Sequence, residues 1–83
     1  MRGVEVQTIR IGRHTVTAGD RLRVAPSSPR RRDGFVGTFR SARVEGDTLI
    51  EITVAGAPTG RPRALRTFRP ERISWMRQER AAS

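Results

Sequence analysis

The chain has 83 residues and no cysteine, so it fits one small domain whose core comes from side-chain packing, without disulfides or thiolate metal sites. The net charge is +9 and all 17 basic residues are arginine, an excess typical of nucleic-acid-binding proteins that also suits acidic protein surfaces. The only histidine, His14, excludes a multi-histidine metal site, and we expect no metal, no cofactor and no membrane-spanning segment.

Short strand signals dominate the chain in sequence order. Apolar and polar residues alternate in short runs that are separated by glycine- and proline-rich turns, and no segment has a helical period of useful length. In the first run, a slip of the alternation at Gln7-Thr8 indicates a bulge or bend. In the second, Ala18-Gly19-Asp20 forms a turn. The predicted strands are residues 4–11, 15–24, 34–44, 48–54, 64–69 and 73–76.

The connections between these strands also follow from residue type. Residues 25–33 contain two prolines and residues 55–63 are rich in glycine and proline, so both are predicted loops. Glu45-Gly46-Asp47 is a short hairpin turn. Pro70-Glu71-Arg72 is predicted to form a single tight helical turn, because proline favours the first helical position.

Five or more short strands with such turns predict an all-β fold, a small barrel or sandwich. A more specific expectation comes from a strand–loop–strand unit with glycines at defined positions. The unit comprises Gly19-Asp20, Leu22 and Val24, then a loop, then Gly34, Val36, Gly37 and Phe39. Gly34 and Gly37 are expected to be bend points of the predicted strand 34–44.

This unit resembles a KOW motif, which occurs in SH3-like barrels of ribosomal proteins and transcription-elongation factors. The chain departs from the motif in its longer loop with two prolines and in its first 18 residues. The resemblance implies a small SH3-like barrel over residues 19–76, an N-terminal strand or hairpin extension over 1–18 and a C-terminal tail over 77–83. It also implies binding of RNA, DNA or protein rather than catalysis, and fold alone does not choose among these partners.

The two long loops are expected to carry most of the functional charge. In an antiparallel meander the first and third connections lie at the same end, so loops 25–33 and 55–63 form an arginine-rich rim, while the acidic turn 45–47 lies at the opposite end. Guanidinium groups match phosphate geometry, and this rim is therefore a predicted phosphate-binding surface. The predicted nucleic-acid-binding residues are Arg30, Arg31, Arg32, Arg40, Arg61, Arg63, Arg66, Arg69 and Phe35.

Aromatic residues limit the kind of contact that is expected. Single-strand binders add exposed aromatic rings for base stacking, but this chain has three phenylalanines, one tryptophan and no tyrosine. The core needs Phe39 and Trp75, which leaves Phe35 and Phe68 as the rings expected to be exposed. The sequence therefore predicts backbone-dominated contact with little sequence specificity.

No pattern in the sequence indicates an enzyme. His14 has no evident nucleophile or acid as a partner and is expected to be solvated or to cap a turn. Asp20 and Asp33 stand where turns need them and are expected to accept hydrogen bonds from nearby backbone amides. The glycine-rich stretch 55–63 lacks the lysine and the helix of a phosphate-binding P-loop.

Two main functions are compatible with the sequence. The first is nucleic-acid binding; the second is a protein-interaction module that regulates a complex such as polymerase or the ribosome. A structural or assembly subunit, pairing through residues 4–11, is a third.

Arginine in place of lysine suggests a high-GC bacterium or its phage. The absence of cysteine and of an apolar leader indicates the cytoplasm.

Overall fold

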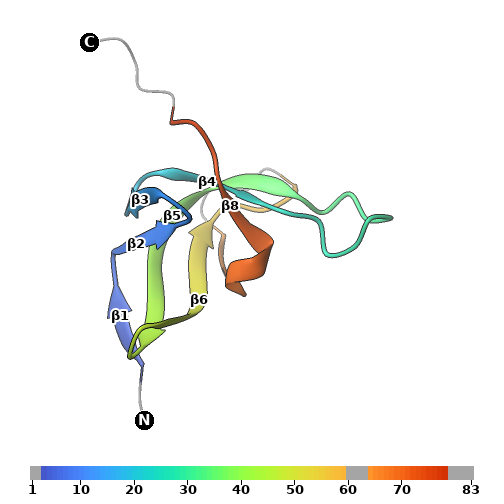
Figure 1. Ribbon diagram of the computed structural model, residues 1–83. Helices are drawn as coiled ribbons and strands as arrows, with labels where there is room; N and C mark the ends of the chain where they lie inside the picture. The colour runs from blue at the N-terminus through green and yellow to red at the C-terminus, as the bar shows by residue number, and fades with distance from the viewer. Residues whose placement is uncertain (1–2, 60–63, 79–83) are drawn as a thin grey trace, which may run out of the picture.

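A computed structural model of the chain describes residues 3–59 and 64–78. These residues form eight strands and one short 3₁₀ helix (Figure 1), and every strand pairing is antiparallel. The predicted all-β fold is confirmed. The elements are β1 Val4–Val6, β2 Thr8–Ile11, β3 His14–Thr17, β4 Arg21–Val24, β5 Phe35–Glu45, β6 Thr48–Ala55, β7 Leu65–Phe68, η1 Pro70–Arg72 and β8 Ile73–Trp75.

The main sheet is a meander whose last strand returns to the first strand of the meander. Its order is β7-β6-β5-β4-β8, and β1 pairs with the far half of β5 beyond the end of β4. Within the described residues no pairing joins β7 to β8, so hydrogen-bonded closure of the predicted barrel is not shown. The single helical turn predicted at Pro70-Glu71-Arg72 is confirmed as η1.

The N-terminal residues add β1 to this sheet and then form a separate two-stranded hairpin. The predicted strand 4–11 is divided into β1 and β2 by a bend at Gln7, as the slip of the alternation predicts. β2 then pairs with β3 around a tight turn in which Gly12 has a φ of 61°. Ile9 and Val16 of this hairpin are buried in the same core as the main sheet.

Alternation along the strands decides which side chains are buried. In β4, Leu22 and Val24 face the core, whereas Arg21 and Arg23 are exposed on the other side. The core contains ten apolar side chains and no buried polar residue among those that the structure describes. They are Ile9, Val16, Leu22, Val24, Phe39, Ala42, Ile52, Val54, Phe68 and Ile73.

Gly37, the glycine within β5, is not where the strand is irregular, contrary to the prediction. The pairing of β5 with β6 shifts register at two places, between Phe39 and Ser41 and between Arg43 and Val44. At the first shift, Arg40 has no Cα partner on β6. Gly37 instead allows close packing, since a Cβ on it would be 2.3 Å from Val54 Cγ1 and 2.8 Å from the Ala55 carbonyl oxygen. The prediction of a bend at Gly37 is therefore wrong; the glycine is required by the neighbouring strand.

Over the described ranges, no helix combines the length and the hydrophobicity that crossing a bilayer requires.

Candidate nucleic-acid interface

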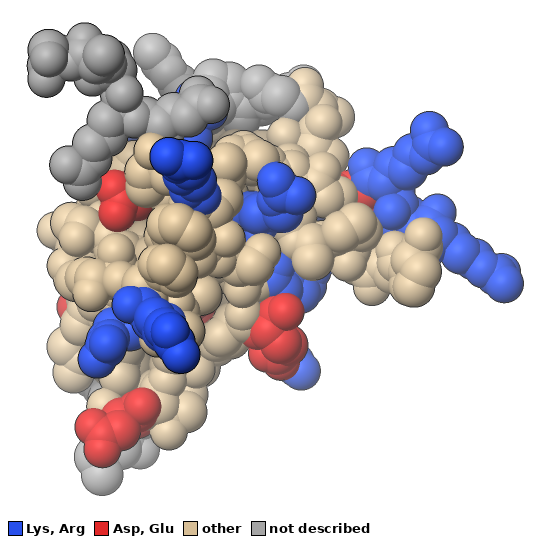
Figure 2. Space-filling view, turned by 45° about the horizontal axis from the view of Figure 1, so that its top comes forward, with Lys and Arg blue, Asp and Glu red and all other residues tan. Residues whose placement is uncertain are grey.

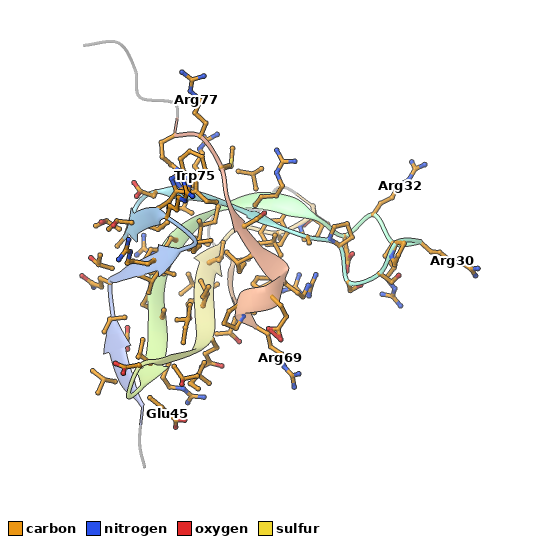
Figure 3. All side chains as sticks on the ribbon, viewed as in Figure 1. Arg30, Arg32, Glu45, Arg69, Trp75 and Arg77 are labelled. Atoms are coloured by element: carbon orange, nitrogen blue, oxygen red, sulfur yellow. The ribbon has the colours of Figure 1, made fainter. Side chains whose placement is uncertain are left out.

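The loop between β4 and β5 projects from the body of the protein (Figure 1), and the sheet below it fixes where it begins and ends. The last pair of the two strands joins Val24 to Phe35, and Pro26 and Pro29 cannot continue the ladder. Arg30, Arg31 and Arg32 are exposed near its tip. Figure 3 shows Arg30 and Arg32 directed away from the sheet.

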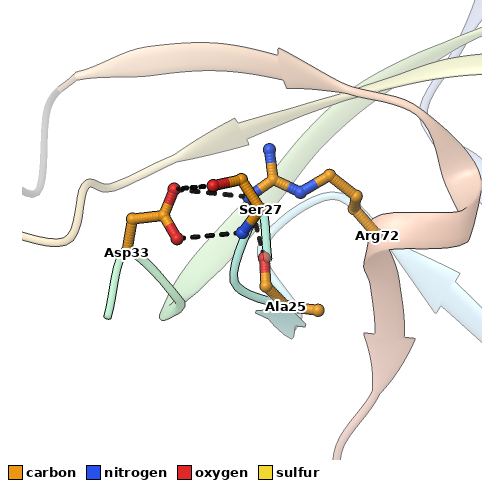
Figure 4. Close-up of polar contacts among 4 residues, drawn as sticks. All are labelled: Ala25, Ser27, Asp33 and Arg72. Carbon is orange, nitrogen blue, oxygen red and sulfur yellow. Dashed lines mark hydrogen bonds and ion pairs between the residues drawn. The ribbon is translucent and has the colours of Figure 1, made fainter. Parts of the chain in front are cut away.

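The only acid of this loop is held at its base. The Ser27 backbone amide donates to Asp33 Oδ1 at 2.9 Å, and the Ser27 hydroxyl donates to Asp33 Oδ2 at 2.7 Å (Figure 4). These two hydrogen bonds, with a smaller contribution from the nearby Arg72 charge, lower the pKa of the Asp33 carboxyl. The expected bond from Asp33 to a nearby backbone amide is confirmed.

Arg72 connects the base of the loop to η1. Its Nη2 donates to the Ala25 carbonyl oxygen at 2.8 Å and lies 4.0 Å from Asp33 Oδ2 (Figure 4), while the Ala25 amide donates to the Arg72 carbonyl at 2.8 Å. The Arg72 guanidinium also lies 5.1 Å from the centroid of the Phe68 ring. Sequence reasoning missed Arg72, because no local pattern indicates a contact with Ala25, 47 residues earlier.

The charge of the loop tip is therefore not compensated by the loop's own acid. The ion pairs among the described residues are Arg43 with Glu51, at 3.6 Å, and Arg72 with Asp33. Neither involves the three arginines of the tip. Figure 2 shows basic side chains at the end of the projection.

The other predicted arginines occupy several places. Arg40 is exposed at the register shift of β5, and Arg66 is exposed on β7 with its guanidinium 5.5 Å from the centroid of the Phe68 ring. Figure 3 shows Arg69 beside η1, extending downward, well separated in this view from Arg30 and Arg32. Arg61 and Arg63 lie outside the described residues. The structure thus brings together Arg30, Arg31 and Arg32, and sets Arg69 apart from them.

The predicted opposition of basic and acidic ends can be followed along β5. The arginine loop precedes this strand, and exposed Glu45 and Asp47 lie in and beside the turn that follows it. Glu45 lies at the bottom of Figure 3, at the far end of the strand. Gly56, at the start of the second long loop, lies against Phe35 at the basic end.

The aromatic rings differ in part from what the sequence predicts. Phe39 is fully buried, as expected, but Phe68 is only 6% exposed, so the expectation of an exposed ring there is wrong. Phe68 pairs with buried Ile52 across β6 and β7, which turns its side chain toward the core. Phe35 is half-buried, with its ring tilted 58° to that of Phe68 at a centroid distance of 5.7 Å.

His14 and Trp75 form a contact that sequence reasoning missed. Their rings stack with centroids 3.6 Å apart and planes at 7°, which joins the β2–β3 hairpin to β8. Trp75 is half-buried and packs against the core, while His14 is exposed. The described residues contain no cluster of three or more His, Asp or Glu side chains placed to hold a metal ion.

Comparisons of the chain with protein-family models, with curated proteins and with solved structures find no match. The resemblance to KOW-type barrels therefore stays a prediction.

Proposed function

We propose that this protein binds nucleic acid without catalysis, by contacting phosphates with Arg30, Arg31 and Arg32 at the tip of loop 25–34. The observation that carries the proposal is the position of Asp33. Because this carboxylate is bonded to Ser27 and faces Arg72 at the base, the loop projects three guanidinium groups without a neutralising acid among the described residues.

Arginine chemistry indicates what such a loop would bind. A guanidinium group donates two parallel hydrogen bonds to a phosphate and keeps its charge at any physiological pH. The three side chains are exposed on a projecting segment, where they can approach a strand from outside. Contacts of this kind position a protein on nucleic acid without reading sequence.

The strand order gives the proposal further support. A five-strand meander whose last strand returns beside the first is compatible with the proposed SH3-like barrel, and small barrels of this type bind through their loops. As part of the same proposal, the protein acts in the cytoplasm of a bacterium or of a phage-infected cell.

The proposal is tested by measuring how the nuclease-treated protein binds labelled duplex DNA, single-stranded DNA and RNA between about 50 and 300 mM salt. Three phosphate contacts predict a log–log slope of about −2.7 on duplex DNA and about −2.1 on a single strand. Absence of binding to all three at about 50 mM salt would contradict the proposal.

A protein-interaction module is the second candidate, and one observation favours it. Leu65 is 63% exposed on β7, and β7 pairs only with β6 among the described residues. An unpaired edge with an exposed apolar side chain can accept a strand from a partner. This candidate predicts a complex with a defined protein partner that persists at moderate salt. The complex should be lost in Leu65→Ser.

A further inference from the structure

The outer face of the main sheet carries two arginines that are not among the predicted site residues. Side chains of a strand alternate between its two faces, so those that stand between buried residues point away from the core. On β4, Arg21 and Arg23 alternate with buried Leu22 and Val24, and both are exposed. The side chains of this outer face are Arg21 and Arg23 of β4, Val36, Thr38, Ser41 and Arg43 of β5, and Glu51, Thr53 and Ala55 of β6.

On the half of this face next to β1, positive charge is compensated within the sheet. Arg43 has Glu5 as its Cα partner on β1 and Glu51 as its Cα partner on β6. Its Nη2 lies 3.6 Å from Glu51 Oε1. The charge of Arg43 is therefore matched by acids of the neighbouring strands.

On the half next to β8, the two arginines of β4 have uncharged neighbours across the strands. Arg21 pairs with Thr38, while Arg23 pairs with Val36 on one side and with Ser74 on the other. The ion pairs among the residues that the structure describes involve neither arginine. Because these neighbours are also short side chains, both guanidinium groups are accessible to a large ligand.

Backbone pairing fixes the positions of these two arginines. β4 lies between β5 and β8, and its pairing with β8 ends at Leu22 and Trp75. The Gln78 side chain continues this edge, since its Oε1 accepts from the Arg21 amide at 2.7 Å and its Nε2 donates to the Arg21 carbonyl at 2.8 Å. Residues two apart on a strand are about 7 Å apart, which is close to the separation of neighbouring phosphates along an extended nucleic-acid strand.

The row on β4 is continuous with the arginine loop. Arg23 lines the same open pocket as Pro26 and Gly34 of the loop base. Figure 2 shows basic side chains on the body of the protein as well as at the end of the projection. Asp33, the acid of the loop base, is bonded to Ser27. A strand held at the loop tip can therefore extend along β4 over a surface of one charge.

We infer that Arg21 and Arg23 form a second phosphate-binding element, which continues the contact of the arginine loop along the outer face of β4. Each guanidinium group donates hydrogen bonds to a further phosphate of the same nucleic acid, so five arginines make up the binding surface. Phosphate contacts carry no sequence information, so this element lengthens the contact without adding specificity. The inference rests on the proposed function and extends its binding surface.

The salt dependence of binding counts the phosphate contacts. The three loop contacts alone predict a log–log slope of about −2.7 on duplex DNA, whereas five contacts predict about −4.5 on the duplex and about −3.5 on a single strand. Between about 50 and 200 mM salt, the affinity of the wild-type protein for the duplex should therefore fall about 500-fold and not about 40-fold.

Glutamine variants assign the added contacts to β4. Arg21→Gln with Arg23→Gln removes two charges and keeps long polar side chains on the strand. The slope should become shallower by about 1.8 on the duplex and by about 1.4 on a single strand. The matched control is Arg10→Gln with Arg13→Gln, which removes two exposed arginines of the β2–β3 hairpin and should keep the wild-type slope. Circular dichroism checks that both double variants fold.

The outcomes separate this inference from the proposed function. A slope that becomes shallower in the β4 variant and stays unchanged in the hairpin variant supports the second element. A wild-type slope of about −2.7 on the duplex, or equal slopes for the two double variants, overturns the inference and leaves the loop contact in place. Absence of binding to duplex and single strands at about 50 mM salt removes the proposed function as well.

Discussion

Asp33 shows how one residue sets the charge of the whole loop. Its side chain accepts two hydrogen bonds from Ser27, which removes the carboxylate from the tip and closes the base of the loop. Residue type alone predicts a bond to a nearby amide at this position, because aspartate favours turns. The contact with Arg72 could not be predicted in the same way, since it depends on where η1 packs against the sheet.

The Asp33 contact should make stability depend on pH in a defined direction. Because its pKa is lower in the folded protein than its ordinary value of 3.8, the contact contributes fully above that value and is lost as the pH falls through the folded pKa. We expect Asp33→Asn to lower the unfolding temperature at about pH 6 and to have a smaller effect at about pH 3.

The matched control for this measurement is Asp47→Asn, which removes an exposed acid at the other end of β5. Thermal unfolding of both variants, followed by circular dichroism, separates the local contact from the general gain of positive charge. Equal destabilisation by Asp33→Asn at both pH values would show that the charged form of the Asp33 side chain does not stabilise the folded protein more than the neutral form does.

Replacing Gly37 by alanine should change stability in a direction that tests the packing of β5 against β6. At an unstrained strand position with open space, glycine to alanine stabilises a protein by about 0.4–1 kcal/mol. Here the new methyl group would overlap Val54 and the Ala55 carbonyl oxygen, so Gly37→Ala should destabilise by about 1–3 kcal/mol or more. Urea unfolding measures the difference, and a stabilised variant would contradict the packing described for β5 and β6.

Among the elements, the N-terminal hairpin shows what a local pattern can and cannot predict. The slip at Gln7-Thr8 predicts the break between β1 and β2. Docking of the hairpin on β8 through His14 and Trp75 joins residues 61 positions apart, and no sequence period reports such a contact.

We expect His14→Ala to weaken that docking. A stacked aromatic pair contributes about 0.5–1.5 kcal/mol beyond the area that it buries, so the free energy of unfolding should fall by about this amount. The fluorescence of Trp75, the only tryptophan, should change with it. Thr15→Ala, an exposed neighbour on β3, is the control, and equal effects of the two changes would count against the stack.

The irregularity of β5 lies at its register shifts and not at Gly37, where the sequence predicts a bend. Phe39 and Ala42 are both buried although three positions separate them, an odd spacing that a regular strand does not allow for one face. This spacing indicates the register shift after Phe39. The glycines drew attention because glycine often marks a bend, whereas here Gly37 provides room for a neighbouring strand.

For the whole molecule, strand order correctly predicted that the arginine loop and the acidic turn lie at opposite ends of β5, whereas residue type mispredicted one exposure. Counting strands correctly separates the arginine loop from the acidic turn at Glu45 and Asp47, because they lie at opposite ends of β5. Exposure of Phe68 was mispredicted, since flanking arginines suggested a surface position. The structure instead places Arg66 and Arg72 over the ring and leaves it in the core.

The proposed contact between the three loop arginines and phosphates is tested most directly by two triple variants with the same net charge. One replaces Arg30, Arg31 and Arg32 by alanine. The other replaces by alanine three exposed arginines elsewhere in the chain, Arg10, Arg13 and Arg77. Since surface changes of this kind alter stability by at most about 0.5 kcal/mol each, both proteins should fold.

The measurement is the slope of log affinity against log salt for duplex and single-stranded DNA. For the loop variant we predict that affinity falls at every salt concentration and that the slope becomes shallower by about 2.7 on the duplex and about 2.1 on the single strand. The second variant should keep a slope close to that of the wild-type protein. Equal slopes for the two variants would contradict the account, because binding would then follow total charge and not the loop.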